Sequence, residues 1–277
     1  MPRLRLPQPY DFALSTERFR AFGPDRANLW HDGGLHRVVG GREVRIEAAP
    51  GGVRVEPLDD RIEPVVRALL GAPFDLAAFS TWAAGADPVL AEVVAALPGY
   101  RPPLVPDPFE ALVGSITAQQ VSLQSAFAIR NRLLERFGEP AGRAIAFPAA
   151  ERLAAAREEE LAALGFSRRK AEYVIGVARS GLDREALASL PDEEVKARIV
   201  AVRGLGEWTA DWFLARHLAR PQAWPAGDLG LRKALAALYR GGRDISTEEA
   251  RAIGARFAPF QNLTAHYLLT GLRVLRR

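Results

Sequence analysis

The chain has 277 residues, of which 48% are hydrophobic and 25% charged, a balance typical of a globular protein with ample material for a core. The absence of cysteine excludes disulfides, thiolate zinc sites, a cysteine nucleophile and a cysteine-ligated iron–sulfur cluster, and the four histidines have no metal-ligand spacing, so we expect no metal or cofactor. No apolar run approaches the ~20 residues that span a bilayer and no secretory stretch opens the chain, so we expect a cytoplasmic protein without a membrane partner. The net charge of +4 permits a polyanionic partner without requiring one.

Residues 1–85 are predicted to form a small α+β domain. Val44 and Ile46 alternate with charged Arg45 and Glu47, which is the half-buried pattern of an antiparallel sheet. Glycine pairs between the apolar runs supply the positive φ that tight hairpin turns need. The predicted strands are Ala27–Asp32, Leu35–Val39, Glu43–Ala48 and Val53–Pro57, and helices are predicted near Arg61–Leu70 and Phe74–Ala84.

Residues 86–277 are predicted to be entirely helical, because apolar residues recur at spacings of three and four and no alternating strand pattern appears. Asp107 and Pro108 are typical of an N-cap and a first helical position. Gly138 is predicted to be a left-handed cap at the end of a helix over Leu123–Phe137. The other predicted helices are Ala149–Ala155, Glu158–Leu164, Arg168–Ala178, Asp192–Ala201, Glu207–Leu218, Leu229–Tyr239, Thr247–Phe257 and Asn262–Leu275.

A Gly-x-Gly hairpin between two helices, at residues 202–210, is the sharpest local feature. Gly204 and Gly206 allow a tight turn whose bare amides, together with the dipole of the next helix, would bind a phosphate. Taken alone, the pattern is more often a plain helical connection. A similar segment lies upstream, where Ser167 is predicted to be an N-cap and Arg168 and two more cations fall in the first turn of the helix. The helix dipole disfavours cations there, so either a bound polyanion or simple exposure to solvent would explain them.

Asp228 lies before an apolar-periodic helix and is a natural N-cap, a position that would also expose its carboxylate at the mouth of a helix. Trp208 and Trp212 are four residues apart and therefore share a helix face. Tryptophan side chains usually pack in the hydrophobic core, which is the ordinary explanation of this pair. Beside a phosphate site and a carboxylate, however, an aromatic pair also fits a pocket for a flipped base, where indole would stack on a cationic alkylated base.

Three segments in this order and spacing, residues 164–171, 204–210 and 225–230, resemble the helix-hairpin-helix DNA glycosylases, in particular the AlkA-like branch of 3-methyladenine DNA glycosylase II. The N-terminal sheet and residues 107–138 resemble the same branch more loosely. The resemblance implies an α+β fold in which a small antiparallel-sheet domain precedes a two-lobed all-α glycosylase domain. It also implies a monomer that acts on double-stranded DNA containing a damaged base.

The resemblance makes Asp228 the catalytic carboxylate and assigns Trp208, Trp212 and Leu269 to the substrate pocket. Gln120 falls where a side chain fills the gap left in the duplex, although this branch commonly has leucine there. The DNA contacts implied in this way are Gln119, Gln120, Ser167, Arg168, Arg203, Gly204, Gly206 and Thr209. Bifunctional relatives carry a lysine nucleophile where this chain has Trp208, which argues against strand cleavage.

We therefore expect a monofunctional DNA glycosylase of base excision repair, a hydrolase of the 3-methyladenine glycosylase II type that flips an alkylated base and cuts its N-glycosidic bond. The expected effect of Asp228→Asn is loss of base release with DNA binding intact. The alternatives are a non-catalytic DNA-damage-binding protein on the same scaffold, a glycosylase for oxidised or deaminated bases, and a phosphate-binding helical module with no nucleic-acid partner.

Overall fold

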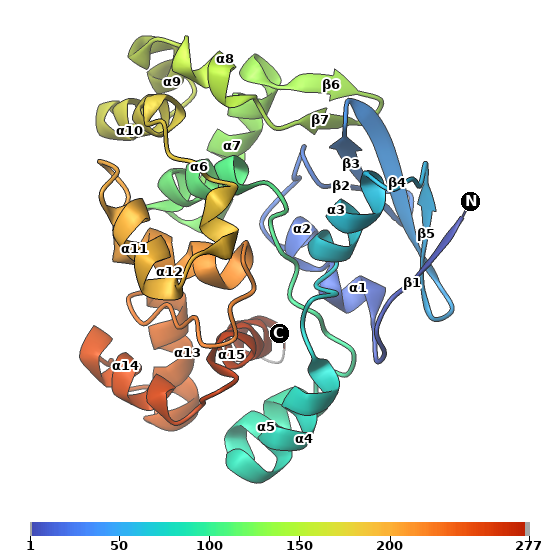
Figure 1. Ribbon diagram of the computed structural model, residues 1–277. Helices are drawn as coiled ribbons and strands as arrows, with labels where there is room; N and C mark the ends of the chain where they lie inside the picture. The colour runs from blue at the N-terminus through green and yellow to red at the C-terminus, as the bar shows by residue number, and fades with distance from the viewer. Residues whose placement is uncertain (1, 275–277) are drawn as a thin grey trace.

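The computed structural model describes residues 2–274. A small sheet with three short helices lies on one side, and a larger helical part lies on the other (Figure 1). The sheet is antiparallel with strand order β1-β5-β4-β3-β2, which confirms the predicted α+β fold. Its strands are β1 (Arg3–Arg5), β2 (Leu29–His31), β3 (Gly34–Val39), β4 (Arg42–Ala49) and β5 (Gly52–Glu56), and its helices are α1 (Phe12–Ser15), α2 (Arg18–Ala21) and α3 (Ile62–Leu69).

The sheet has one buried face, as the alternation of β4 predicts. Leu35, Ile46 and Val55 lie opposite one another on three neighbouring strands and are fully buried. These side chains pack with Ile62 and Val66 of α3. Strand β1 was not predicted, because three residues between prolines are too short to show a period of two.

Within the larger helical part, α6 (Pro108–Ala118) follows Asp107, whose side chain accepts a hydrogen bond from the Glu110 amide, as predicted for an N-cap. Helix α7 (Leu123–Phe137) has the predicted bounds. The prediction for Gly138 is wrong, since its φ is −78°. A glycine is needed there because a Cβ would lie 2.5 Å from the Ala146 carbonyl oxygen.

The prediction that no strand follows residue 107 is also wrong. Strands β6 (Glu139–Ala141) and β7 (Ala144–Ala146) form a short hairpin, and the Ile145 amide donates to the carbonyl oxygen of Arg26. Strands of three residues are too short to show a period of two, so the sequence gives no signal for them.

The remaining helices follow the predicted order with small shifts at their ends, and Leu275 of the last predicted helix lies outside the described residues. Helix α5 was not predicted. The bounds are α4 (Leu76–Ala86), α5 (Pro88–Ala95), α8 (Ala150–Ala154), α9 (Glu158–Ala163), α10 (Arg168–Arg179), a 3₁₀ turn η1 (Ala186–Ser189), α11 (Asp192–Val200), α12 (Glu207–Arg216), α13 (Leu229–Tyr239), α14 (Thr247–Ala255) and α15 (Gln261–Val274).

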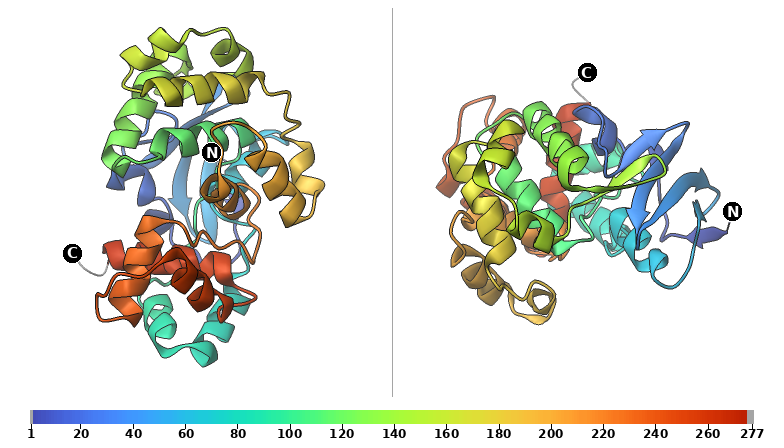
Figure 2. Two further views of the ribbon diagram at one scale, coloured as in Figure 1. Left: turned by 90° about the vertical axis from the view of Figure 1, so that its left-hand side faces the viewer. Right: turned by 90° about the horizontal axis from the view of Figure 1, so that it is seen from above.

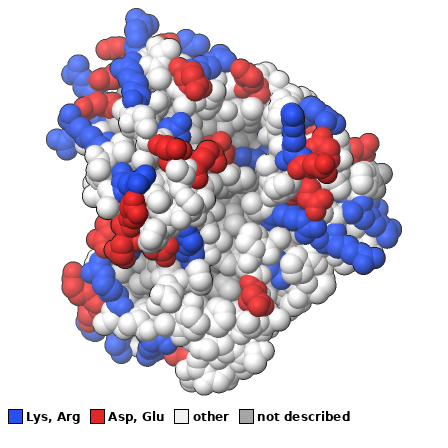
Figure 3. All heavy atoms as spheres, viewed as in Figure 1, with Lys and Arg blue, Asp and Glu red and all other residues white. Residues whose placement is uncertain are grey.

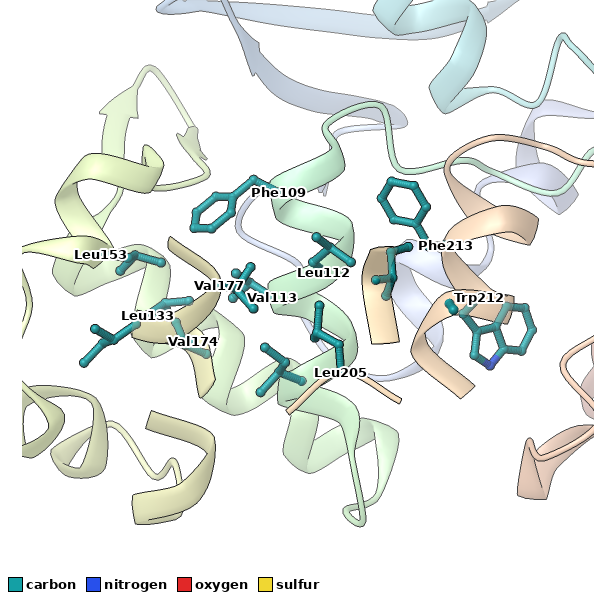
Figure 4. Close-up of a cluster of buried hydrophobic side chains, with 14 of the residues drawn as sticks. Phe109, Leu112, Val113, Leu133, Leu153, Val174, Val177, Leu205, Trp212 and Phe213 are labelled. Carbon is teal, nitrogen blue, oxygen red and sulfur yellow. The ribbon is translucent and has the colours of Figure 1, made fainter. Parts of the chain in front are cut away.

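Two apolar cores underlie two helical lobes (Figure 2). In the first, Phe109, Leu112 and Val113 of α6 lie between Val174 of α10 on one side and Phe213 of α12 on the other (Figure 4). The second core joins residues 74–104 to residues 226–268. The domain boundary predicted at residue 85 stays a prediction. Because α4 and α5 pack in this second core, we propose that the N-terminal domain ends before α4.

A buried ionic network connects the sheet to α6 and α7. Arg37 Nη2 lies 2.6 Å from Glu110 Oε2, and Arg130 pairs with both Glu110 and Asp25. Burial alone would raise the pKa of the Glu110 carboxyl, but Arg37 and Arg130 outweigh burial and hold that pKa below its usual value. The network therefore keeps its carboxylates ionised and fixes the N-terminal domain against the helices.

Charge is not segregated by sign on the face shown in Figure 3, where basic and acidic side chains are interspersed. A binding site for a polyanion would therefore depend on the arrangement of a few neighbouring groups and not on a broad basic surface. Within residues 2–274, no helix has the length and apolarity needed to cross a membrane.

Candidate active site

A cavity of about 1090 Å³ lies where the N-terminal domain, both helical lobes and the hairpin helix meet. It brings together most of the site residues predicted from the sequence, which come from the α6–α7 turn, from α12, from the start of α13 and from α15. The predicted residues among its lining are Gln119, Gln120, Gly206, Trp208, Thr209, Trp212, Asp228 and Leu269.

Asp228 is the N-cap of α13, and every hydrogen bond it makes holds its carboxylate in one orientation. Oδ1 accepts from the Leu231 amide at 2.9 Å. Oδ2 accepts from the indole Nε1 of Trp208 at 3.1 Å and of Trp212 at 3.0 Å. The N-cap prediction is confirmed, the Asp228 side chain is half-buried in the cavity wall, and the role of the indoles as donors was not predicted.

One face of the Trp212 ring is covered by the Arg216 guanidinium, whose Cζ lies 3.6 Å from the ring centroid. His266 meets the same ring edge-on. Trp212 is 4% exposed and Trp208 is half-buried, so Trp208 is the more accessible of the two indoles. Stacking of a base on either ring stays a prediction.

The Gly-x-Gly turn has the shape that the sequence predicts. Gly204 has a φ of +92°, and Gly206 is the N-cap of α12. Within the described residues, the amides of Gly204, Gly206 and Glu207 donate no hydrogen bond, so they are free for an outside acceptor. Free amides at a helix N-terminus are suited to binding a phosphate.

The α6–α7 turn is tied to this hairpin. The Gln119 amide Nε2 donates to the Gly204 carbonyl oxygen at 3.0 Å, and Lys170 Nζ donates to the Thr117 carbonyl oxygen at 3.0 Å. Gln120 has a φ of +54° and an exposed side chain. Gln119 is therefore engaged with protein, while Gln120 remains free to enter a duplex.

The side chains of the remaining predicted DNA contacts differ in their exposure to solvent. Ser167 caps α10, Arg168 is highly exposed near Glu158 of α9, and Arg203 of the hairpin is highly exposed and pairs with Glu172 at 3.0 Å. Thr209 is only 1% exposed and its hydroxyl has no partner. This burial favours a place in the cavity wall for Thr209, and its contact with DNA stays a prediction.

Three further features of the cavity were not predicted. Arg18 and Arg216 line it, and the apolar side chains of Val121 and Leu229, which are 39% and 56% exposed, lie at its edge. A spacing of four from Trp208 through Trp212 is the signal that would have found Arg216. Arg18 comes from the N-terminal domain, and no pattern in the neighbouring sequence predicts that it lines the cavity.

Residues 113–259 match the family model of the HhH-GPD superfamily base excision DNA repair protein. The chain is 32% identical to a DNA-3-methyladenine glycosylase of Bacillus subtilis over 67% of its own length and 64% of that protein's, which is less than two thirds of the relative. The fold is similar to that of a 3-methyladenine DNA glycosylase from Archaeoglobus fulgidus, with a TM-score of 0.89, 26% identity and 99% of each chain covered. It is also similar to a Schizosaccharomyces pombe 3-methyladenine DNA glycosylase in complex with abasic DNA, with a TM-score of 0.61, 26% identity and coverage of 69% of this chain and 94% of the other. The chain therefore belongs to the HhH-GPD superfamily of base excision DNA repair proteins.

Proposed function

We propose that this chain is a monofunctional DNA glycosylase that flips alkylated bases out of the duplex and hydrolyses their N-glycosidic bonds. The observation that carries the proposal is the Asp228 carboxylate, held by two indole N–H groups in the wall of a cavity that the Gly-x-Gly hairpin borders. The names of the relatives support alkylated bases as the substrate class. Action as a monomer in the cytoplasm belongs to the same proposal.

The hairpin would bind the duplex through its backbone. Free amides at Gly204 and Gly206 bind a phosphate without reading a base. Gln120, exposed on the α6–α7 turn, then fills the space that the extruded nucleotide leaves in the duplex. Damaged bases pair and stack weakly, so extruding them costs less, which supplies part of the selectivity.

Asp228 would act on the sugar. As the C1′–N bond of an alkylated base breaks, its electron pair passes to the base and positive charge develops on the deoxyribose. A carboxylate fixed beforehand stabilises that charge and accepts a proton from the water that adds to C1′. The indole donors keep Oδ2 in place, so little reorganisation is needed at the moment of reaction.

The composition of the hairpin helix supports hydrolysis without strand cleavage. Helix α12 contains no lysine, and the position where bifunctional relatives carry their nucleophile is Trp208. Lys233 of α13 is the lysine that lines the cavity, and we assign it to phosphate contact.

Methylated DNA and duplexes with a single hypoxanthine, 8-oxoguanine or uracil, incubated with the purified protein, test the proposal. We expect release of methylated purines, identified by chromatography, and strand breaks only after alkali treatment. Tight binding with no base released would favour the non-catalytic alternative. Strand breaks without alkali would contradict the monofunctional assignment, and their loss in Lys233→Ala would identify the amine.

A further inference from the structure

Helix α12 presents a stripe of three side chains to the cavity at spacings of four: Trp208, Trp212 and Arg216. The stripe begins beside Gly206 of the hairpin. Eight residues of α-helix rise about 12 Å, so Arg216 lies at the end of the stripe farthest from the phosphate-binding turn. Asp228 bonds to the two tryptophans and therefore lies between the hairpin and Arg216.

The Arg216 guanidinium has no protein acceptor. Within residues 2–274 it makes no hydrogen bond or ion pair, and its Nε is buried and unpartnered. Arg18 enters the same cavity from the N-terminal domain and, within residues 2–274, makes no ion pair or hydrogen bond with a carboxylate, although Asp25 and Asp228 also line the cavity. Burial and Arg18 lower the pKa of Arg216 well below its ordinary range, with Asp228 opposing them, and burial together with Arg273 lowers the pKa of Arg18 to about 10.

A buried donor without an acceptor is costly, so the Arg216 guanidinium, which stacks on the Trp212 ring but has no hydrogen-bond acceptor, indicates a ligand that brings one. A ligand in this cavity would meet both Asp228 and Arg216, since both residues line it. In a flipped purine nucleotide, the sugar is attached at N9 and faces the carboxylate. The opposite edge of the ring, which carries position 6, then faces the guanidinium.

We propose that Arg216 is a specificity-determining residue that reads the oxygen at position 6 of the flipped purine. The protein would thus prefer 6-oxopurines, both 7-methylguanine and hypoxanthine, over 6-aminopurines such as 3-methyladenine. The inference rests on the proposed glycosylase function and narrows its substrate class.

The chemistry at the base favours the same class. A 6-oxo group accepts a hydrogen bond from a guanidinium, whereas a 6-amino group is itself a donor and leaves the arginine unpaired. Arg18 and Arg216 have no ion-pair partner within residues 2–274, so they also oppose entry of a cationic base, which 3-methyladenine brings without a compensating acceptor. Excision of the neutral base hypoxanthine would be accelerated most by Arg216. When its C1′–N9 bond breaks, the electron pair passes to the base, which leaves as an anion that Arg216 stabilises. Water adds to C1′, and its proton passes to Asp228 and then to the departing base.

The test is the ratio of bases released by Arg216→Gln and by the parent protein. Within one sample of methylated DNA, we expect the ratio of 7-methylguanine to 3-methyladenine to fall by roughly tenfold to a hundredfold in the variant, the value of a hydrogen bond from a charged donor. Release from a hypoxanthine duplex should fall by a similar factor. A merely structural role would lower all three rates together and leave the ratio unchanged.

Arg198→Gln is the matched control, because Arg198 is an exposed arginine of α11 that pairs with Glu194 away from the cavity. Its ratio should equal that of the parent. If Arg216→Gln does not fold, judged by its thermal melt, Arg18→Gln removes a second guanidinium that has no ion-pair partner within residues 2–274 and should shift the ratio in the same direction. An unchanged ratio in an active, folded variant would overturn the inference alone, whereas release of no base by the parent would overturn the proposed function.

Discussion

The indole Nε1 of Trp212 lies 3.0 Å from Oδ2 of Asp228, although the two residues belong to different helices. Trp212 is 4% exposed and packs in the core of the first lobe, while Asp228 begins α13, which packs in the second. The hydrogen bond therefore spans the boundary between the two cores. The orientation of the carboxylate thus depends on how the lobes are packed against each other.

Replacing either indole with a ring that cannot donate tests this dependence. Trp208→Phe and Trp212→Phe each remove one hydrogen bond to a charged acceptor, so we expect single-turnover base release to slow by roughly tenfold to a hundredfold. DNA affinity should not change. Trp224→Phe is the control, because its Nε1 donates to the Ala250 carbonyl oxygen at 2.9 Å away from the cavity. Parental rates in both site variants would show that the indoles do not position the carboxylate.

The two hairpin glycines should respond differently to alanine. A Cβ on Gly204 would lie 2.2 Å from the Tyr173 ring, at a φ of +92° that disfavours any side chain. Gly204→Ala should therefore cost at least about 1 kcal/mol of unfolding free energy and weaken DNA binding. A Cβ on Gly206 meets nothing within 4 Å, so Gly206→Ala should keep its melting temperature and lose only affinity for DNA. Equal melting temperatures for the two variants would contradict the geometry of the turn.

The pH dependence of stability should carry a signature of His266. Burial, together with Arg216, Arg18 and Arg273, lowers the pKa of His266 well below its ordinary value. Below pH ~6.5 the unfolded chain binds a proton that the folded protein does not, so folding loses stability as the pH falls, by about 1.4 kcal/mol at pH 5.5 from this group. His266→Phe should lose less stability than the parent between pH 7.5 and 5.5 in urea titrations. An equal loss in the two proteins would show that His266 is charged or solvated in the fold.

Local signals in the sequence were sufficient for most of the helices, although α1, α2 and α5 were missed. Asp107 and Ser122 accept hydrogen bonds as N-caps in the structure, and α7 and α13 have the predicted bounds because caps and apolar spacing lie within the segment itself. Strands β1, β6 and β7 were missed because each has only three residues, too few to show a period of two; β1 pairs with the distant β5, and β6 and β7 pair with each other.

For the cavity, the sequence identified which residues carry chemistry but not what each one contacts. Asp228, Trp208 and Trp212 meet as expected, yet the indoles bind the carboxylate through their N–H groups. Gln119 bonds to the Gly204 carbonyl oxygen, a contact that was not predicted, and its contact with DNA stays a prediction. Arg216 was missed because an arginine at a helix end is ordinary until the cavity around it is seen.

The central claim is that the Asp228 carboxylate performs the chemistry rather than only capping α13. Asp75→Asn is a matched control, because Asp75 caps α4 in the same way, through the Ala78 amide at 3.0 Å, and lies outside the cavity. Asparagine caps a helix about as well as aspartate, so neither variant should unfold.

The most direct measurement is therefore the single-turnover release of methylated purines by Asp228→Asn, with DNA affinity determined on the same preparation. We predict that release falls by at least about a hundredfold, while affinity stays within about twofold because phosphate contacts dominate binding. Asp75→Asn should match the parent in both. Release by Asp228→Asn at the parental rate would contradict the account.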